Sequence, residues 1–296
     1  MAHLICPVCE KEAFRKRFTV KDHFLTLKDF TIAACVNCGM LVTADAPGEQ
    51  EMADYYQSDD YISHSDNRKG LVNKTYHFVR RIMLRKKYGI IRKANGKTTG
   101  KILDIGTGTG YFLNFMKEKG WTTEGTEKNE NAREFARNNW QLTVYSDNQL
   151  SSLNPGSFDA ITLWHVLEHL PDLREHFRAM RSLLSKEGIL VIAVPNAASF
   201  DARHYKEYWA ALDVPRHLWH FTPDHIRKLG LKEGFVLTGI HRMPFDAFYI
   251  SIMSEKYRQS RFPLIKGMIY GKISWLASLF DKKNCSSLVY VFKQRE

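Results

Sequence analysis

Short apolar segments alternate with amphipathic segments over the last two thirds of the chain. Helical spacing of apolar residues follows several of the apolar runs, for example at Tyr111–Lys119 and Pro223–Glu233. Alternation of strands with helices is typical of a doubly wound α/β fold. The predicted strands are Lys101–Ile105, Thr122–Glu127, Leu142–Tyr145, Phe158–Trp164, Gly188–Val194, Val236–Arg242 and Ser287–Phe292.

Other segments precede or interrupt this pattern. Residues 1–45 hold strand-like residues between two cysteine pairs, and residues 46–95 comprise a turn-rich linker and a basic amphipathic helix at Asn73–Lys93. The α/β domain is predicted over residues 96–296, with a helical insertion at about residues 243–285. Within it, Phe262–Phe280 is amphipathic and basic; it is expected to close a pocket or form a homodimer face, and the alternative is peripheral contact with a membrane.

Composition adds little to the prediction of the fold but limits the classes of binding partner. The 296 residues are 44% hydrophobic and 25% charged, as in ordinary globular proteins. The N-terminal residues are polar, and no apolar run approaches the roughly 20 residues of a membrane span. We therefore expect a cytoplasmic protein. The net charge of +11 suits an anionic small molecule, a membrane surface or, as a weaker alternative, nucleic acid.

Four cysteines form two C-x-x-C pairs, Cys6 with Cys9 and Cys35 with Cys38. Each pair offers two thiolates from a tight turn, and two such pairs complete a tetrahedral zinc site. Two disulfides are the alternative, which a cytoplasmic compartment disfavours. The spacing predicts a zinc-ribbon-like module with structural zinc, whose closed site serves folding or docking. The fifth cysteine, Cys285, is predicted to be a packed thiol.

The segment KILDIGTGTG joins the first strand of the α/β domain to the next helix. A short apolar strand ends in an acid, Asp104, and is followed by Gly106, Gly108 and Gly110 at alternate positions. Glycines here allow a sharp turn and close approach to a ligand at the helix N-terminus. A dinucleotide fingerprint would need another glycine where Tyr111 stands. The pattern that remains is a G-x-G-x-G turn preceded by an acid.

Further motifs follow this turn in order: Glu127 at the end of the second strand, the segment FDAITLWHVLEHLPD, and the segment EGILVIAVPN. Together they resemble class I S-adenosyl-L-methionine (SAM) methyltransferases of the ubiquinone-biosynthesis-type branch over about residues 75–240. Thr107 stands where that family often has cysteine or serine. The resemblance implies a Rossmann-like, seven-stranded sheet with an antiparallel last strand, and SAM as cofactor. A zinc-ribbon-like start also resembles a subset of bacterial methyltransferases, some of which act on nucleotide-linked sugars.

The cofactor site is expected at the carboxyl ends of the strands, where ligands of doubly wound sheets bind. Glu127 is predicted to accept hydrogen bonds from the ribose, and Asp104 to face the methionine moiety. Asp147 and Asn148 are candidates for the adenine edge. The predicted cofactor-binding residues are Asp104, Gly106, Thr107, Gly108, Gly110, Glu127, Asp147, Asn148, Trp164 and His165.

A long excursion follows the fifth strand and precedes the helix at Pro223. Loops of this length are usually functional, and this one begins at the carboxyl end of a strand. It is therefore expected to line the substrate pocket, where Arg216 would clamp a phosphate or carboxylate. In the alternative interpretation it packs and caps the next helix, with His217 and His220 as core histidines. The predicted substrate contacts are Tyr205, Trp209, Arg216 and His220.

Methyl transfer to oxygen or carbon requires removal of a proton, and histidine suits that role near neutral pH. The candidates for this general base are His165, His217 and His169 in that order, with Glu168 behind them. His165 and His169 are also spaced to share a divalent metal.

The sequence thus predicts a methyltransferase acting on an oxygen or carbon of a small molecule, such as a sugar or envelope precursor. One alternative is an RNA-modifying enzyme that docks RNA through the zinc ribbon and the basic helix. Another is a non-catalytic protein that keeps the SAM-binding fold.

Overall fold

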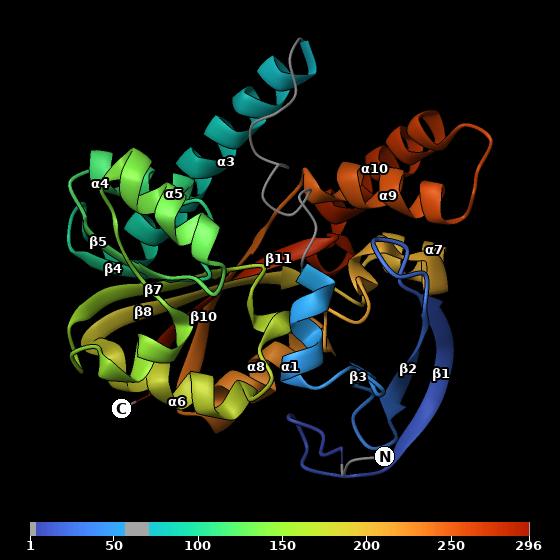
Figure 1. The fold of residues 1–296 in the computed structure, drawn as a ribbon, viewed down its shortest axis with the longest axis horizontal. Coiled ribbons are helices and arrows are strands. Elements are labelled where there is room, and N and C mark those ends of the chain that lie inside the picture. Colours follow the sequence, from blue (N-terminus) through green and yellow to red (C-terminus); the bar gives the residue numbers. More distant parts are fainter. Residues whose placement is uncertain (1–3, 57–70, 296) are drawn as a thin grey trace.

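The computed structural model describes residues 4–56 and 71–295. Two sheets dominate the architecture, and helices cover the larger one on both faces (Figure 1). The strands are β1 (Phe14–Lys21), β2 (Asp29–Cys35), β3 (Leu41–Thr43), β4 (Lys101–Ile105), β5 (Thr122–Thr126), β6 (Thr143–Tyr145), β7 (Phe158–Trp164), β8 (Leu184–Pro195), β9 (Trp219–His220), β10 (Phe235–Arg242) and β11 (Ser287–Gln294). The α-helices are α1 (Glu49–Met52), α3 (Leu71–Asn95), α4 (Tyr111–Glu118), α5 (Glu130–Trp140), α6 (Leu173–Leu183), α7 (Phe200–Tyr205), α8 (Pro223–Lys232), α9 (Asp246–Tyr257) and α10 (Pro263–Phe280).

The larger sheet has seven strands in the order β10-β11-β8-β7-β4-β5-β6. β11 runs antiparallel to both β8 and β10, whereas the pairs formed by β4 with β5 and β7, by β5 with β6, and by β7 with β8 are parallel. This confirms the predicted doubly wound sheet with an antiparallel last strand. The strand order reverses between β4 and β7, which places a ligand crevice at their carboxyl ends.

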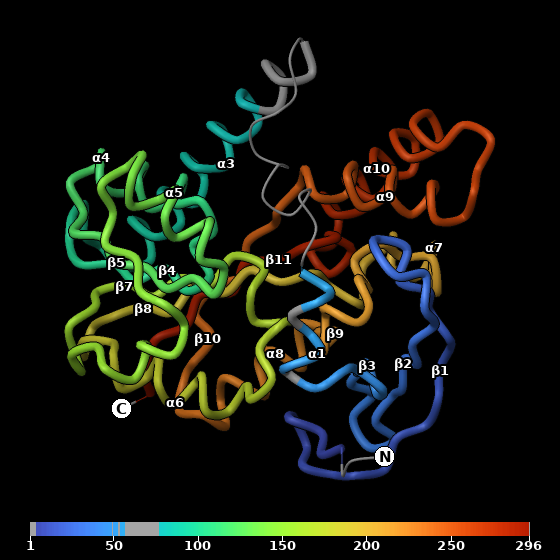
Figure 2. The backbone as a smooth tube through the Cα atoms, in the orientation of Figure 1, coloured from blue at the N-terminus to red at the C-terminus, as the bar shows by residue number. Residues whose placement is uncertain are grey.

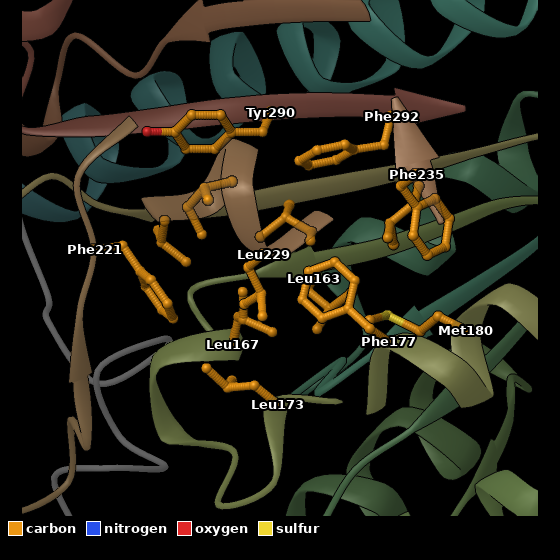
Figure 3. Packing of buried hydrophobic residues seen from close by; sticks show 14 of the residues in the cluster. Leu163, Leu167, Leu173, Phe177, Met180, Phe221, Leu229, Phe235, Tyr290 and Phe292 are labelled. Atoms are coloured by element: carbon orange, nitrogen blue, oxygen red, sulfur yellow. The ribbon is translucent and has the colours of Figure 1, made fainter. Parts of the chain in front are cut away.

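The core of the larger sheet lies in two layers because its central strands are buried on both faces. In β8, alternate side chains belong to different apolar clusters. One cluster, which also contains residues of α6 and α8 and is drawn in part in Figure 3, includes Leu190, Ile192 and Val194. The other, with residues of α3, α4 and α5, includes Ile189, Val191 and Ala193. Because side chains alternate between the two faces of the strands, helices pack on both faces of the sheet. This packing fixes the positions of β4 and β7.

The smaller sheet has the order β1-β2-β3-β9, and its last strand comes from the excursion after β8 (Figure 2). β9 pairs antiparallel with β3, and the Thr43 hydroxyl donates a 2.6 Å hydrogen bond to the His217 carbonyl. The cysteine-bearing turns also share the first apolar cluster through Cys6 and Cys35. The predicted boundary near residue 45 therefore separates two sequence patterns, but residues from both sides of it pack in one apolar cluster.

A buried ion pair joins the excursion to the β1–β2 hairpin. Arg216 lies 3.1 Å from Asp22 and also pairs with Asp213, while the side chains of Arg216 and Asp22 are 3% and 0% exposed. Asp22 accepts further hydrogen bonds from the backbone N–H groups of Phe24 and Thr26. Burial opposes its charge, but these donors and the arginine hold the pKa of Asp22 below its ordinary value. The path of the excursion is therefore set by the N-terminal hairpin.

Candidate functional site

The glycine turn between β4 and α4 has the backbone that its sequence predicts. Gly106, Gly108 and Gly110 have φ values of 68°, 56° and 81°, in the left-handed region that favours glycine. A Cβ on Gly106 would lie 2.5 Å from Val166, and one on Gly110 would lie 2.7 Å from Leu142. A Cβ on Gly108 would meet nothing within 4 Å. The outer two glycines are therefore required by packing as well, whereas the middle one borders open space.

Glu127 lies at the mouth of this turn, directly after β5. Its Oε2 atom accepts a 2.8 Å hydrogen bond from the Gly108 N–H, and its Oε1 atom accepts one of 2.9 Å from the Asn129 N–H. A carboxylate has about four acceptor sites, so two remain for a ligand. Open space at Gly108 beside an oriented carboxylate fits the ribose end of SAM.

Asp104 is buried at the end of β4 and accepts a 2.5 Å hydrogen bond from the Thr162 hydroxyl. Burial raises the pKa of Asp104 to about 6, opposed by Thr162 and by the cation of Lys87. Lys87 comes from α3 and lies 4.2 Å from the ring centroid of Trp164. Burial lowers the pKa of Lys87 to about 8. Asp104, Trp164 and Lys87 thus lie together at the carboxyl ends of β4 and β7.

Lys87 and Asp246 are site residues that the sequence analysis missed. Lys87 lies four residues after Met83 and three before Ile90, both of which pack in the second apolar cluster. That spacing puts Lys87 on the apolar face of α3, so the sequence pattern alone indicates that this lysine points toward the core. Asp246 begins α9 in the insertion and reaches the site only through folding, so no pattern in the neighbouring sequence indicates its role.

His165 follows β7 and is held between two carboxylates. Its φ is 59°, and its N–H donates to the Ala193 carbonyl. Its Nε2 atom lies 3.2 Å from Asp246, its Nδ1 atom lies 3.5 Å from Glu168, and the side chain is 35% exposed. Burial lowers its pKa, but Asp246 and Glu168 outweigh that effect and raise the pKa to about 10. A doubly protonated imidazolium cannot accept a proton, so this geometry favours a cationic anchor over the predicted general base.

Glu168 is buried beside the predicted histidines. Its Oε1 atom lies 4.0 Å from His217 Nε2, and neither oxygen has a hydrogen-bond partner of normal geometry within the part of the chain that the structure describes. Burial raises its pKa, but the surrounding histidines outweigh this and keep the pKa below the ordinary value. Glu168, His169 and His217 each offer a ligand atom within 4.8 Å of the others, which is compatible with a divalent cation.

His217 and His169 lie edge to face, with ring centroids 4.6 Å apart. His217 Nδ1 lies 2.8 Å from the Ala211 carbonyl, which can only accept, so Nδ1 carries the proton and Nε2 keeps its lone pair in the neutral ring. His169 Nδ1 lies 3.0 Å from both the Arg216 carbonyl and the Tyr56 hydroxyl. Burial and the neighbouring His217 lower the pKa of His169 to about 4. In its neutral form His217 thus faces Glu168 with an unprotonated Nε2 atom.

The predicted substrate contacts lie in the interior. Tyr205, Trp209, Arg216 and His220 are each no more than 3% exposed. Trp209 donates a 2.8 Å hydrogen bond to Asp201, and His220 Nε2 lies 3.2 Å from the Thr43 hydroxyl. Burial lowers the pKa of His220 to about 3. An anionic substrate would have to displace Asp22 or Asp213 to bind Arg216, so the placement favours the packing interpretation of these four residues.

Asp147 and Asn148 are exposed in the 3-10 turn that follows β6. The Asn148 N–H bonds to the Asp147 side chain at 3.0 Å. Their contact with adenine stays a prediction.

The four paired cysteines come together at one end of the smaller sheet. Their sulfur atoms lie within 4.8 Å of one another, with 3.5 Å between Cys6 and Cys38 and 3.4 Å between Cys9 and Cys35, and none of the four forms a disulfide. Burial opposes ionisation of Cys9, but hydrogen bonds from Lys11 and other neighbours lower its pKa to about 6. This donor set and spacing fit a tetrahedral zinc ion.

Comparisons with known proteins agree with this geometry. A family model described as "Methyltransferase domain" matches residues 77–239. The ubiquinone biosynthesis O-methyltransferase of Haemophilus ducreyi is 33% identical over 115 residues, which are 35% of this chain and 49% of that protein. The chain spans about half the length of the first curated relatives it matches.

Two solved structures share the fold. One is magnesium protoporphyrin IX methyltransferase from Synechocystis PCC 6803 with bound S-adenosylhomocysteine. Its TM-score is 0.55 at 14% identity, and the match covers 84% of this chain and 100% of that chain. The Burkholderia thailandensis 1,6-didemethyltoxoflavin-N1-methyltransferase, solved with its namesake compound and S-adenosylhomocysteine, has a TM-score of 0.50 at 16% identity and covers 88% and 98%. At these identities the likeness shows the fold alone.

The charge of His165 is testable by NMR of histidine-labelled protein. We expect its ring to remain doubly protonated at pH 8, and Asp246→Asn to lower its pKa toward the ordinary value of about 6.5. Because the folded pKa lies above the unfolded one, the associated stabilisation is complete below about pH 6.5 and is lost as the pH rises through about 10. Asp213→Asn, beside His217, is the control. A neutral His165 at pH 8 in the unmodified protein would contradict the assignment.

Proposed function

Because the chain belongs to the methyltransferase domain family, we propose that it transfers a methyl group from SAM to an oxygen atom of a small molecule. The observation behind the cofactor is the Glu127 carboxylate, which is oriented by the Gly108 N–H and retains free acceptor sites. The name of the Haemophilus ducreyi relative, an O-methyltransferase, supports oxygen as the acceptor atom.

The residues that would hold SAM follow from the crevice. Glu127 would accept hydrogen bonds from the ribose hydroxyls, and the turn at Gly108 would let the cofactor approach the main chain closely. Asp104 would face the methionine end, and Asp147 and Asn148 would flank the adenine. When bound, SAM supplies an electrophilic methyl group on a sulfonium centre. The protein contributes alignment of the acceptor and exclusion of water.

His217 is our candidate for the general base. Its Nδ1–H is fixed by the Ala211 carbonyl, so the acceptor hydroxyl would deliver its proton to Nε2. The Glu168 carboxylate, 4.0 Å from Nε2, stabilises the imidazolium that results. His165, already cationic between Asp246 and Glu168, instead positions that carboxylate.

Zinc in the four-cysteine cluster is the second part of the proposal. The ion would hold the cysteine-bearing turns together and so support the smaller sheet. That sheet includes β9, which anchors the segment carrying His217.

Calorimetry tests cofactor binding. Glu127→Ala should weaken SAM binding by about 10- to 100-fold, because it removes hydrogen bonds to a charged acceptor. Glu134→Ala, a solvent-side acid on α5, should leave the affinity unchanged. Absence of SAM binding by the unmodified protein would favour a non-catalytic role for the fold.

Transfer of labelled methyl from SAM to a panel of hydroxylated acceptors tests the base. His217→Gln should lower kcat/KM by about 10²- to 10⁴-fold while SAM affinity is kept. The residual rate should rise with pH, because hydroxide or an ionised acceptor then replaces the base. Equal rates for His217→Gln and the unmodified protein would exclude His217 and return the assignment to His169 or Glu168.

Metal analysis of the purified protein tests the zinc site. We expect about one zinc per chain, and loss of both metal and thermal stability in Cys9→Ser. Cys285→Ser is the matched control, since this thiol is buried away from the cluster at the Met243 carbonyl and should leave the zinc content unchanged. A metal-free protein that melts at the same temperature as the zinc-loaded protein would refute a structural role.

A further inference from the structure

The α9–α10 hairpin projects from the body of the protein, at the upper right of Figure 1. Its two helices approach closely along a stripe of small, buried residues on α10. A Cβ on Gly267 would lie 2.5 Å from the Ile252 Cα, and one on Gly271 would lie 2.8 Å from the Phe248 Cα. Ser274 and Ser278 continue the stripe and are buried. This close packing fixes which side of α10 faces α9 and therefore which side faces outward.

The outward side of α10 is apolar, contrary to what a solvent-facing helix needs. Phe280 is 92% exposed, and Leu264 and Ile265 are 62% and 60% exposed. Spacing of three and four residues joins these side chains into one continuous stripe. We call it the α10 apolar face; its residues are Leu264, Ile265, Met268, Ile269, Ile273, Leu276, Leu279 and Phe280. A contiguous apolar surface of this kind marks an interaction site.

Positive charge surrounds this face. Residues 256–283 carry one exposed acid, Asp281, against seven exposed cations. The cations are Lys256, Arg258, Arg261, Lys266, Lys272, Lys282 and Lys283. A hollow of about 490 Å³ next to the face is lined by Arg258 and Lys266, together with Ser260, Tyr270 and the buried Glu255. Basic side chains around an apolar helical face are typical of elements that lie in the interface of an anionic membrane.

Charge also discriminates between occupants of the face. A second copy of this chain would bring its own cations against these cations, and like charges across an interface disfavour association. An anionic lipid surface neutralises them while its acyl region receives the apolar side chains. Within the described residues no helix has the length and hydropathy to cross a bilayer, so the contact would be peripheral.

We propose that the α9–α10 hairpin docks the protein on an anionic membrane surface by inserting the α10 apolar face between lipid headgroups. The base of the hairpin lies in the candidate site, because α9 begins at Asp246, which contacts His165. Docking would therefore keep the site within the length of one hairpin of the bilayer. This inference does not depend on the proposed methyl transfer.

Vesicle flotation of the full chain tests the proposal. The protein should bind vesicles of equal parts phosphatidylcholine and phosphatidylglycerol, and bind phosphatidylcholine alone at least about tenfold more weakly at low salt. The double substitution Ile265→Glu with Ile269→Glu should lower the partition coefficient by about tenfold or more. The matched control is Leu231→Glu with Val236→Glu, two exposed apolar positions outside the hairpin, which should bind as the unmodified protein does.

Other outcomes would overturn the proposal. These are equal binding to both vesicle types, unchanged binding of the α10 variant, and a dimer in light scattering that the α10 variant converts to monomer without any effect on vesicles. Circular dichroism and SAM calorimetry on the same variants report the fold and the cofactor site separately. Loss of vesicle binding with an intact melting curve and intact SAM affinity supports the membrane role, whereas a failure of methyl transfer alone leaves it unaffected.

Discussion

The arrangement of the candidate site depends on one buried ion pair, that of Arg216 with Asp22. It fastens the excursion after β8 to the N-terminal hairpin at a place where neither partner reaches water. Removing one member of a buried pair costs about 3–5 kcal/mol, because the other charge is left without compensation. The pairing of β9 with β3 adds backbone hydrogen bonds to the same junction. Together they deliver His217 to the end of β7, so the cysteine-bearing module helps to build a site that it does not enter.

Charge balance within the site follows from that placement. Glu168 is buried without a hydrogen-bond partner of normal geometry among the described residues. His165 supplies the compensating charge, and His217 faces the same carboxylate from a separate segment. A carboxylate desolvated in this way keeps its negative charge only while cations or hydrogen-bond donors stay nearby. The site is therefore a coupled network, in which moving one histidine changes the charge of the next. This coupling explains why a single histidine, taken alone, predicts poorly which ring accepts a proton.

Local order along the chain accounts for the predictions that agree with the structure. The glycine turn, Asp104 and Glu127 lie at ends of consecutive parallel strands, whose carboxyl ends meet at one edge by topology. The four cysteines met for a similar reason, since each pair is a tight turn and a hairpin joins them. In contrast, the charge of Arg216 alone predicts an anion clamp. Its partner Asp22 lies far away in sequence, and no pattern in either segment indicates that the two residues pair.

The sequence by itself determined the seven-stranded sheet, its order of motifs and the position of the glycine turn. It could do so because periodicity and strand-end chemistry act over a few residues. Only the tertiary structure decided which histidine is charged, which aromatic residues are core, and that Lys87 and Asp246 belong to the site. Burial and the distances between charges control those properties, and both depend on segments that meet only after folding. The exposed apolar face of α10 likewise depends on tertiary structure. The amphipathic pattern does not say what the helix packs against, and the packing of its glycines against α9 decides which side faces outward.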